Sequence, residues 1–290
     1  MWTEEHRRRH QACLKEIVSQ QAEEEMARWL RQADPPRSPT ATSILAVVRA
    51  IAWHLRVGGP WRALPSAMPP GTASPFFPPG DRLRRWRTVY GWFRRWLDHG
   101  LFDALLVEIA KLRRRAAGRR SVPRLAILDT QAVKCIAVRG PRGYDAGKQV
   151  LGRKRVALVD ADGNWLAVAV VPASVQDRDT PPALNQSLSA WPSWRLAVFD
   201  GAFTADDCRA WTNFHGMRHQ VVSRAPGQTG FVVLPRRWVV ERSFGWLTPW
   251  GGLLRERAGR LDVAAGRLAF VAVLSGVQAL LNPQPIRKAA

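Results

Sequence analysis

The sequence of 290 residues lacks several features, and each absence excludes a class of protein. Its three cysteines, Cys13, Cys135 and Cys208, are too few and too scattered for a disulfide framework or a zinc site. It has no uninterrupted run of the roughly 18 apolar residues that indicate a membrane-spanning helix, so we expect no membrane span. Its charged N-terminus does not resemble a signal peptide. We therefore expect a reducing compartment, the cytoplasm.

Acidic residues are also scarce. The chain has 23 Asp and Glu against 44 Lys and Arg, which gives a formal net charge of +21. Codon bias in a GC-rich genome would explain arginine in place of lysine, but not the excess of basic over acidic residues. Such an excess favours a polyanionic partner, and nucleic acid is the default candidate. The apolar content of 46% is enough to form a core, so general disorder is excluded.

The chain divides into three predicted parts. Residues 1–40 read as a charged, solvated helical extension. Residues 41–120 read as an α-helical domain with a core helix at 43–57, a proline-rich loop and a basic helix at 82–95, and the basic run 111–120 reads as a linker. From 121 to 290 the pattern changes to a strand, a β-hairpin at an Asp-Gly turn, and then alternating helices and strands. This order predicts an α/β fold with a mixed sheet covered by helices.

Three acids stand out in this basic chain. Asp129 and Asp200 each follow a predicted buried strand, and Glu241 lies within a predicted helix. If the two strands are neighbours, both aspartates reach the same edge of the sheet, where ligands of such sheets gather. Clustered carboxylates need cations, and hard oxygen ligands favour Mg²⁺ or Mn²⁺. Each acid also has an ordinary explanation: the aspartates could cap turns, and Glu241 could pair with Arg237.

Several segments, in order along the chain, resemble the transposases of the IS5 family, which belong to the DDE class. Upstream, 61–65 (WRALP) and 88–96 (TVYGWFRRW) are similar to the helical N-terminal region of that family. The remaining matching segments are 128–134 (LDTQAVK), 147–155 (GKQVLGRKR), 175–179 (VQDRD), 199–203 (FDGAF) and 237–247 (RWVVERSFGWL).

This resemblance implies an RNase H-like catalytic domain with a five-stranded sheet. It also implies that Asp129, Asp200 and Glu241 hold two Mg²⁺ (or Mn²⁺) ions. Two such ions stabilise the attacking and leaving oxygens of a phosphodiester displacement. The implied reaction is cleavage at the ends of an insertion sequence and transfer of the freed 3′-hydroxyl to target DNA. The implied partners are double-stranded DNA, as terminal inverted repeats and target, and a second copy of the chain in a homodimer or larger assembly, near the bacterial nucleoid.

One segment departs from the family pattern. Relatives continue the helix after the glutamate into an arginine-rich stretch, whereas this chain has 248–254 (TPWGGLL). Arg255, Arg257 and Arg260 are the candidates to replace the missing cations. The departure leaves open an inactive or domesticated DNA-binding relative, and the metal site alone leaves open a purely hydrolytic nuclease. A glycosidase would also use paired carboxylates, but a chain of this charge does not suit a neutral sugar.

Basic residues near these acids are candidate DNA contacts. Lys148, Lys154 and Arg155 lie beside the second predicted strand, where an exposed cation-protected edge strand is the alternative explanation. Arg242 and Arg237 flank Glu241, and Arg237 is the more ambiguous because it could pair with Glu241. Asp177 and Asp179 read as caps of the following helix. The basic helix contributes the largest set of candidate DNA contacts, which comprises Arg82, Arg84, Arg85, Arg87, Arg94 and Arg95.

Overall fold

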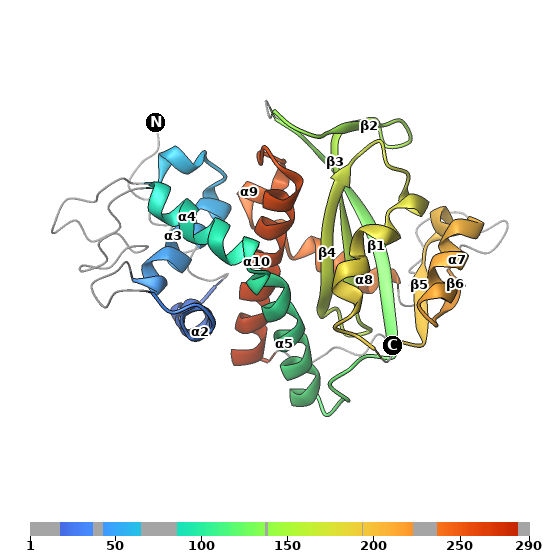
Figure 1. Cartoon of the computed structure of the whole chain (residues 1–290), viewed down its shortest axis with the longest axis horizontal. Coiled ribbons are helices and arrows are strands. Elements are labelled where there is room, and N and C mark those ends of the chain that lie inside the picture. Colours follow the sequence, from blue (N-terminus) through green and yellow to red (C-terminus); the bar gives the residue numbers. More distant parts are fainter. Residues whose placement is uncertain are drawn as a thin grey trace.

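The computed structural model describes residues 18–36, 43–64, 86–136, 139–192, 194–222 and 237–283. A group of N-terminal helices lies on one side and a twisted sheet on the other, with α5 and α10 between them (Figure 1). The helices and strands are α2 (Gln20–Ala33), α3 (Ile44–Val57), η1 (Trp61–Ala63), α4 (Trp86–Asp98), α5 (Leu101–Ala116), β1 (Leu125–Lys134), β2 (Gly143–Asp145), β3 (Val150–Val159), β4 (Trp165–Pro172), η2 (Asp177–Asp179), η3 (Pro181–Leu184), α6 (Asn185–Leu188), β5 (Leu196–Phe199), η4 (Gly201–Phe203), α7 (Asp206–Phe214), β6 (Arg218–Val221), α8 (Arg237–Gly245), α9 (Gly251–Leu254) and α10 (Leu261–Leu281).

The predicted core helix at 43–57 is confirmed as α3. The Ser43 hydroxyl accepts a hydrogen bond from the backbone N–H of Ala46, and Gly58 ends the helix in the left-handed conformation that glycine favours. Beyond Gly58, the ring of Trp61 stacks on His54 at a centroid distance of 3.9 Å, which fixes the start of the following loop against α3.

The expectation that the N-terminal extension is solvated is wrong for α2. Ala22, Met26 and Leu30 are fully buried, because α2 packs against α3 and α10. Glu23 pairs with Arg49 of α3 at 3.2 Å. A thin apolar stripe is enough to dock a helix when two other helices cover it. Residues 1–17 lie outside the described part of the chain.

The sheet has the order β2-β3-β1-β5-β6, and β4 pairs with β3. The first four strands are antiparallel, whereas β1, β5 and β6 run parallel to one another. The predicted α/β class, with a mixed helix-flanked sheet and an all-helical N-terminal region, is confirmed and is consistent with an RNase H-like fold. The sequence analysis missed β2, whose three residues are too few to show a strand period.

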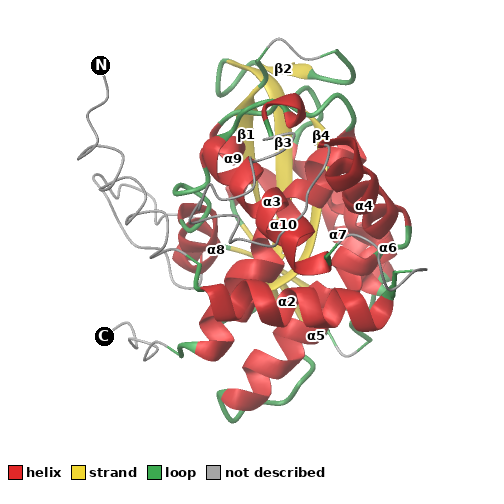
Figure 2. Cartoon of the chain, turned by 90° about the vertical axis from the view of Figure 1, so that its left-hand side faces the viewer, coloured by secondary structure: helices red, strands yellow, loops and turns green. Residues whose placement is uncertain are grey.

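The two faces of the sheet belong to different hydrophobic clusters. Ile127 and Val198 pack with α8 and α10, whereas Leu128 and Phe199 pack with η3 and α7. Figure 2 shows the helices that lie in front of the sheet when it is viewed from the N-terminal side. The first cluster also contains residues of α2 to α5, so one core runs from the N-terminal helices into the sheet.

The predicted linker at 111–120 is mostly helical. α5 continues to Ala116, and Arg114 is buried because it forms an ion pair with Asp160 in the β3–β4 turn. Among the described residues, α10 is long and apolar enough to cross a membrane, but 72% of its apolar window is buried, as in a core helix. The division at residue 121 stays a prediction.

Candidate active site at the edge of the sheet

Asp129 and Asp200 lie on neighbouring strands. β1 and β5 pair in parallel, with Leu125 opposite Leu196 and Ile127 opposite Val198. Continuing this register by two residues places Asp129 opposite Asp200. Side chains alternate along a strand, so both aspartates share the face of Ile127 and Val198, on which α8 and α10 pack. The expected meeting of these two acids at one edge is therefore supported by the pairing of the strands.

The prediction that Asp129 follows the end of its strand is wrong, because β1 runs from Leu125 to Lys134. β1 continues to Lys134 because β3 pairs with it along that length, whereas β5 pairs only with its first part. Asp129 thus lies where the parallel pairing stops and one side of β1 becomes open. The Asp129 carboxylate, although it is held by a strand, therefore has access to the space beyond the end of β5.

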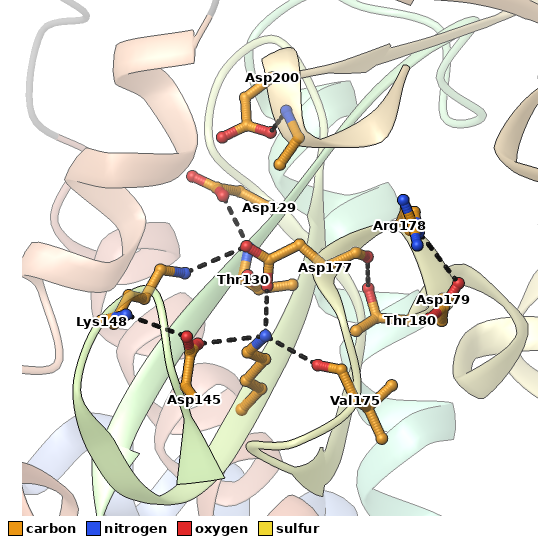
Figure 3. Close-up of polar contacts among 12 residues, drawn as sticks. Asp129, Thr130, Asp145, Lys148, Val175, Asp177, Arg178, Asp179, Thr180 and Asp200 are labelled. Carbon is orange, nitrogen blue, oxygen red and sulfur yellow. Dashed lines mark hydrogen bonds and ion pairs between the residues drawn. The ribbon is translucent and has the colours of Figure 1, made fainter. Parts of the chain in front are cut away.

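Local hydrogen bonds orient both carboxylates. The Asp129 carboxylate accepts a hydrogen bond from the Thr130 backbone N–H at 2.7 Å, and its residue is only 9% exposed. The Asp200 carboxylate accepts one from the Ala202 backbone N–H at 2.9 Å at the start of η4. Figure 3 shows the hydrogen bond that each of the two carboxylates accepts. Asp200 thus does cap the turn that follows it. A cap of this kind also orients the carboxylate for a ligand.

Glu241 lies on α8, which packs against β1 and β3 on the same face of the sheet. Val240 and Phe244 of this helix are buried, as is Leu247 just after it, whereas Glu241 is exposed. Among the described residues, no group of three or more His, Cys, Asp and Glu side chains is placed to hold a metal ion. The strand register thus places two of the three predicted acids at matching positions, and the third lies on a helix that packs against β1.

The donor set of the aspartate pair suits a hard divalent cation. Two carboxylates at matching positions of adjacent strands repel each other unless a cation neutralises them, and carboxylate oxygens are preferred ligands of Mg²⁺ and Mn²⁺. The side chains of Asp129 and Asp200 therefore fit such an ion, and Glu241, which is exposed on α8, would have to turn to join them.

Asp177 was predicted as a helix cap, and this prediction is wrong. Its carboxylate accepts a hydrogen bond from the Thr130 hydroxyl at 2.7 Å and pairs with Lys148 at 3.2 Å and Lys154 at 3.0 Å (Figure 3). Burial raises the pKa of Asp177, but the hydrogen bonds from Thr130 and Lys154 outweigh it, so the net pKa is lowered. Because Thr130 also donates to Asp129, this network fixes the β1 backbone at the candidate site. Asp179, the other predicted cap, has an exposed side chain beside Arg178.

Lys154 and Arg155 are buried, so the alternative of an exposed edge strand is wrong: β3 is an inner strand between β1 and β4. Lys154 donates to the carbonyl of Val175 at 2.7 Å, and Arg155 donates to Gln131 at 3.1 Å. Burial lowers the pKa of Arg155 to about 10. Lys148 is 43% exposed and is the most accessible of the three predicted DNA contacts beside β3. Their contact with DNA stays a prediction.

Arg242 of α8 lies between two aromatic rings, one on the same helix and one in the residue that follows it. Its guanidinium is 4.4 Å from the ring centroid of Trp238 and 5.0 Å from that of Trp246, and it donates to the Asp162 carbonyl at 2.9 Å. These contacts tie α8 to the β3–β4 turn. The side chain of Arg237 lies outside the described part of the structure.

The basic helix is only partly described, since Arg82, Arg84 and Arg85 lie outside the described residues. Arg94 pairs with Asp98 and Asp262, and Arg95 pairs with Asp34. Arg87 lies over the ring of Trp86 at 5.5 Å. Two of the predicted DNA contacts therefore also hold α4 against its neighbours, and their contact with DNA stays a prediction.

The segment after α8, which lacks the arginine-rich stretch of relatives, packs instead against the end of α3. A Cβ atom on Gly252 would lie 2.5 Å from the Leu55 carbonyl oxygen, so α9 approaches the α3 backbone at a distance that only glycine allows. The next residues line a pocket of about 290 Å³ beside the site. Its walls include Gln131, Arg155, Phe244, Leu253 and Arg255. Arg255 is thus one cation that reaches the neighbourhood of the site from outside the helix.

Comparison with known families identifies the part of the chain that carries these acids. A family model described as "Transposase DDE domain" matches residues 120–275, which is more than half of the chain and includes Asp129, Asp200 and Glu241. No curated protein matches the chain.

Proposed function

Because the chain belongs to the transposase DDE domain family, we propose that it is a DNA transposase of the IS5 type that cleaves the ends of an insertion sequence and joins them to target DNA. The proposal divides the chain into the charged extension 1–40, a DNA-binding helical domain 41–120 and a catalytic domain 121–290. The observation that carries it is the parallel pairing of β1 with β5, which sets Asp129 opposite Asp200.

In this proposal Asp129, Asp200 and Glu241 hold two divalent ions, Mg²⁺ or Mn²⁺. Such ions would supply activation of a water or 3′-hydroxyl and neutralisation of the leaving oxygen. The chain's own residues supply the geometry: Thr130 and the backbone of η4 orient the two aspartates, and Asp177 fixes Thr130 from the opposite face.

The placement of α8 supports Glu241 as the third acid. Phe244, three residues after Glu241, lines the same pocket as Gln131, two residues after Asp129. The helix and the strand therefore approach each other on the face that carries both aspartates. The proposal requires the exposed Glu241 side chain to turn toward β1 when the ions bind.

The net charge of +21 supports a double-stranded DNA partner, since a strongly basic surface binds phosphates without reading sequence. Transposition joins two element ends to one target, so the proposed working form is at least a homodimer on DNA. The proposed location is the bacterial cytoplasm, on the nucleoid.

The test uses a DNA duplex that carries the terminal inverted repeat flanking this reading frame. With Mg²⁺, the wild-type chain is expected to cut at the repeat end and join it to a plasmid. Asp200→Asn keeps the size of the side chain and is expected to lose both reactions, whereas it should keep DNA binding. Asp206→Asn on α7 is the matched control, because Asp206 is an exposed aspartate that is not one of the three predicted acids.

Each outcome of this test has one meaning. Cutting without joining would identify a hydrolytic nuclease and overturn the proposed strand transfer. Specific binding of the repeat without cutting, by the wild type with either metal, would identify an inactive DNA-binding relative. Equal activity of the wild type and Asp200→Asn would overturn the assignment of the site.

A further inference from the structure

Three arginines surround a second pocket, at the end of the sheet opposite the candidate active site. Arg120, Arg124 and Arg195 line a pocket of about 300 Å³ together with Ser121 and Val122. No acidic residue is among the described residues that line it, so the pocket presents three positive charges and a hydroxyl.

The backbone holds two of these arginines side by side. The Arg124 carbonyl accepts hydrogen bonds from the backbone N–H groups of Arg195 and Leu196, at 3.0 and 3.1 Å. The first pair of β1 and β5 follows at once, with Leu125 opposite Leu196, so Arg124 and Arg195 occupy matching positions on adjacent parallel strands. Neighbouring strands lie about 4.8 Å apart, so the two arginine side chains leave the backbone close to each other. At such a separation their like charges repel. Because the strand pairing fixes both backbones, Arg124 and Arg195 cannot move apart.

Two arginines that precede the pocket in the chain are neutralised by acids, unlike the three that line it. Arg114 pairs with Asp160, and Arg119 pairs with Asp162 at 2.7 Å. Within the described residues, no ion pair or side-chain hydrogen bond engages the guanidinium groups of the three arginines of the pocket, and all three are exposed. An anion of matching shape would relieve their repulsion, since arginine binds phosphate groups through paired N–H donors.

The pocket lies at a distance from the candidate active site, where the phosphodiester would be cleaved. Arg124 precedes β1, and Asp129 lies five residues further along, about 16 Å at the rise of an extended strand. Val122 packs against the cluster of Leu128 and Phe199, which is on the face opposite the aspartates. A DNA segment bound here is therefore not the nucleotide at which cleavage occurs.

We propose that Arg120, Arg124 and Arg195 form a second DNA-binding site, which takes the sugar-phosphate backbone of duplex DNA away from the cleaved end. The site contacts phosphates alone, so it binds DNA of any sequence and supports either the flank of the element or the target. This inference rests on DNA being the substrate, as the family implies, and not on the identity of the catalytic acids.

The test measures binding of a duplex of arbitrary sequence, about 100 Å long at 3.4 Å for each base-pair step. Fluorescence anisotropy is recorded in EDTA over a series of salt concentrations, so catalysis does not enter. The variant carries Arg120→Gln, Arg124→Gln and Arg195→Gln. The matched control carries Arg28→Gln, Arg31→Gln and Arg209→Gln, which removes three exposed charges from α2 and α7, outside the proposed DNA-binding domain.

The pocket variant is expected to bind the duplex more weakly than the control. Its slope of log K against log salt should fall by up to about 2.7, at about 0.9 for each phosphate that the protein no longer neutralises. A variant with lysine at the three pocket positions, which keeps the charge, should retain most of the slope and shows that folding is not the cause. Equal slopes for the pocket variant and the control would overturn the inference. The two tests are independent. Failure of the pocket in the binding test would not change the outcome of the Asp200→Asn cleavage test, and the cleavage result would not change the binding test.

Discussion

The close packing of α9 on α3 gives a prediction whose sign depends on the tertiary structure. In Gly252→Ala the new Cβ would lie 2.5 Å from the Leu55 carbonyl oxygen and 3.0 Å from its carbonyl and α carbons. The carbonyl-oxygen contact is roughly 1 Å inside the ordinary van der Waals separation of about 3.5 Å. Because all of these atoms belong to the backbone of α3, they cannot move aside as a flexible side chain could, and α9 must shift.

The magnitude follows from two opposing terms. Replacing glycine with alanine in a helix stabilises it by at most about 1 kcal/mol. Overpacking against a fixed backbone costs about 1–3 kcal/mol, and here the upper part of that range applies because no side chain can give way. We therefore expect Gly252→Ala to lower the free energy of unfolding by about 1–2 kcal/mol. Because α9 follows α8 closely, we also expect DNA cleavage to fall.

Gly91→Ala is the matched control for this prediction. Gly91 lies inside α4, and a Cβ there would meet nothing within 4 Å. The same chemical change should therefore raise the free energy of unfolding by about 0.5–1 kcal/mol. Urea unfolding followed by tryptophan fluorescence measures both variants. If the two variants change stability in the same direction, the close approach of α9 to α3 is refuted.

Two further predictions concern buried charges. Burial, with a smaller contribution from Arg267, lowers the pKa of His54 from 6.5 to about 3, so between these values the unfolded chain binds a proton that the folded chain does not. Stability should therefore fall on acidification below about pH 6.5, by up to about 1.4 kcal/mol per pH unit, and His54→Phe should remove this part of the slope in urea titrations at several pH values. Glu256 pairs with the buried Arg267 at 3.0 Å. Glu256→Gln leaves that guanidinium without its countercharge and should cost about 3–5 kcal/mol, partly recovered in the double variant with Arg267→Met; a loss well under 1 kcal/mol would contradict the buried pair.

The sequence predicted most of the secondary structure where local signals were strong. Ser43 and Gly58 delimit α3 as their capping preferences require, and Asp-Gly at 162–163 forms the turn between β3 and β4. Local patterns failed where a distant partner decided the outcome. Asp177 has the surroundings of a helix cap, but Lys154 and Thr130, from strands brought close by the sheet, bind its carboxylate instead.

Burial of basic residues was the hardest feature to predict. Lys154 and Arg155 resemble an exposed, cation-protected strand, yet both are inside, because Val175 and Leu253 supply carbonyl acceptors from segments far along the chain. A hydrophobic period cannot reveal such burial, since it depends on hydrogen-bond partners that the sequence neighbourhood does not contain. No local signal distinguished Arg124 and Arg195, which only the parallel pairing of β1 and β5 brings together.

By itself, the sequence determined the α/β class, and it predicted the three candidate acids and a polyanionic partner, because composition, period and short motifs are local properties. Only the tertiary structure decided that β1 pairs in parallel with β5, which aligns Asp129 with Asp200, and that Glu241 is exposed on α8. It alone also decided which arginines are buried in ion pairs and hydrogen bonds and which are exposed. These outcomes depend on strand register and helix packing, which bring together residues separated by many positions in the chain.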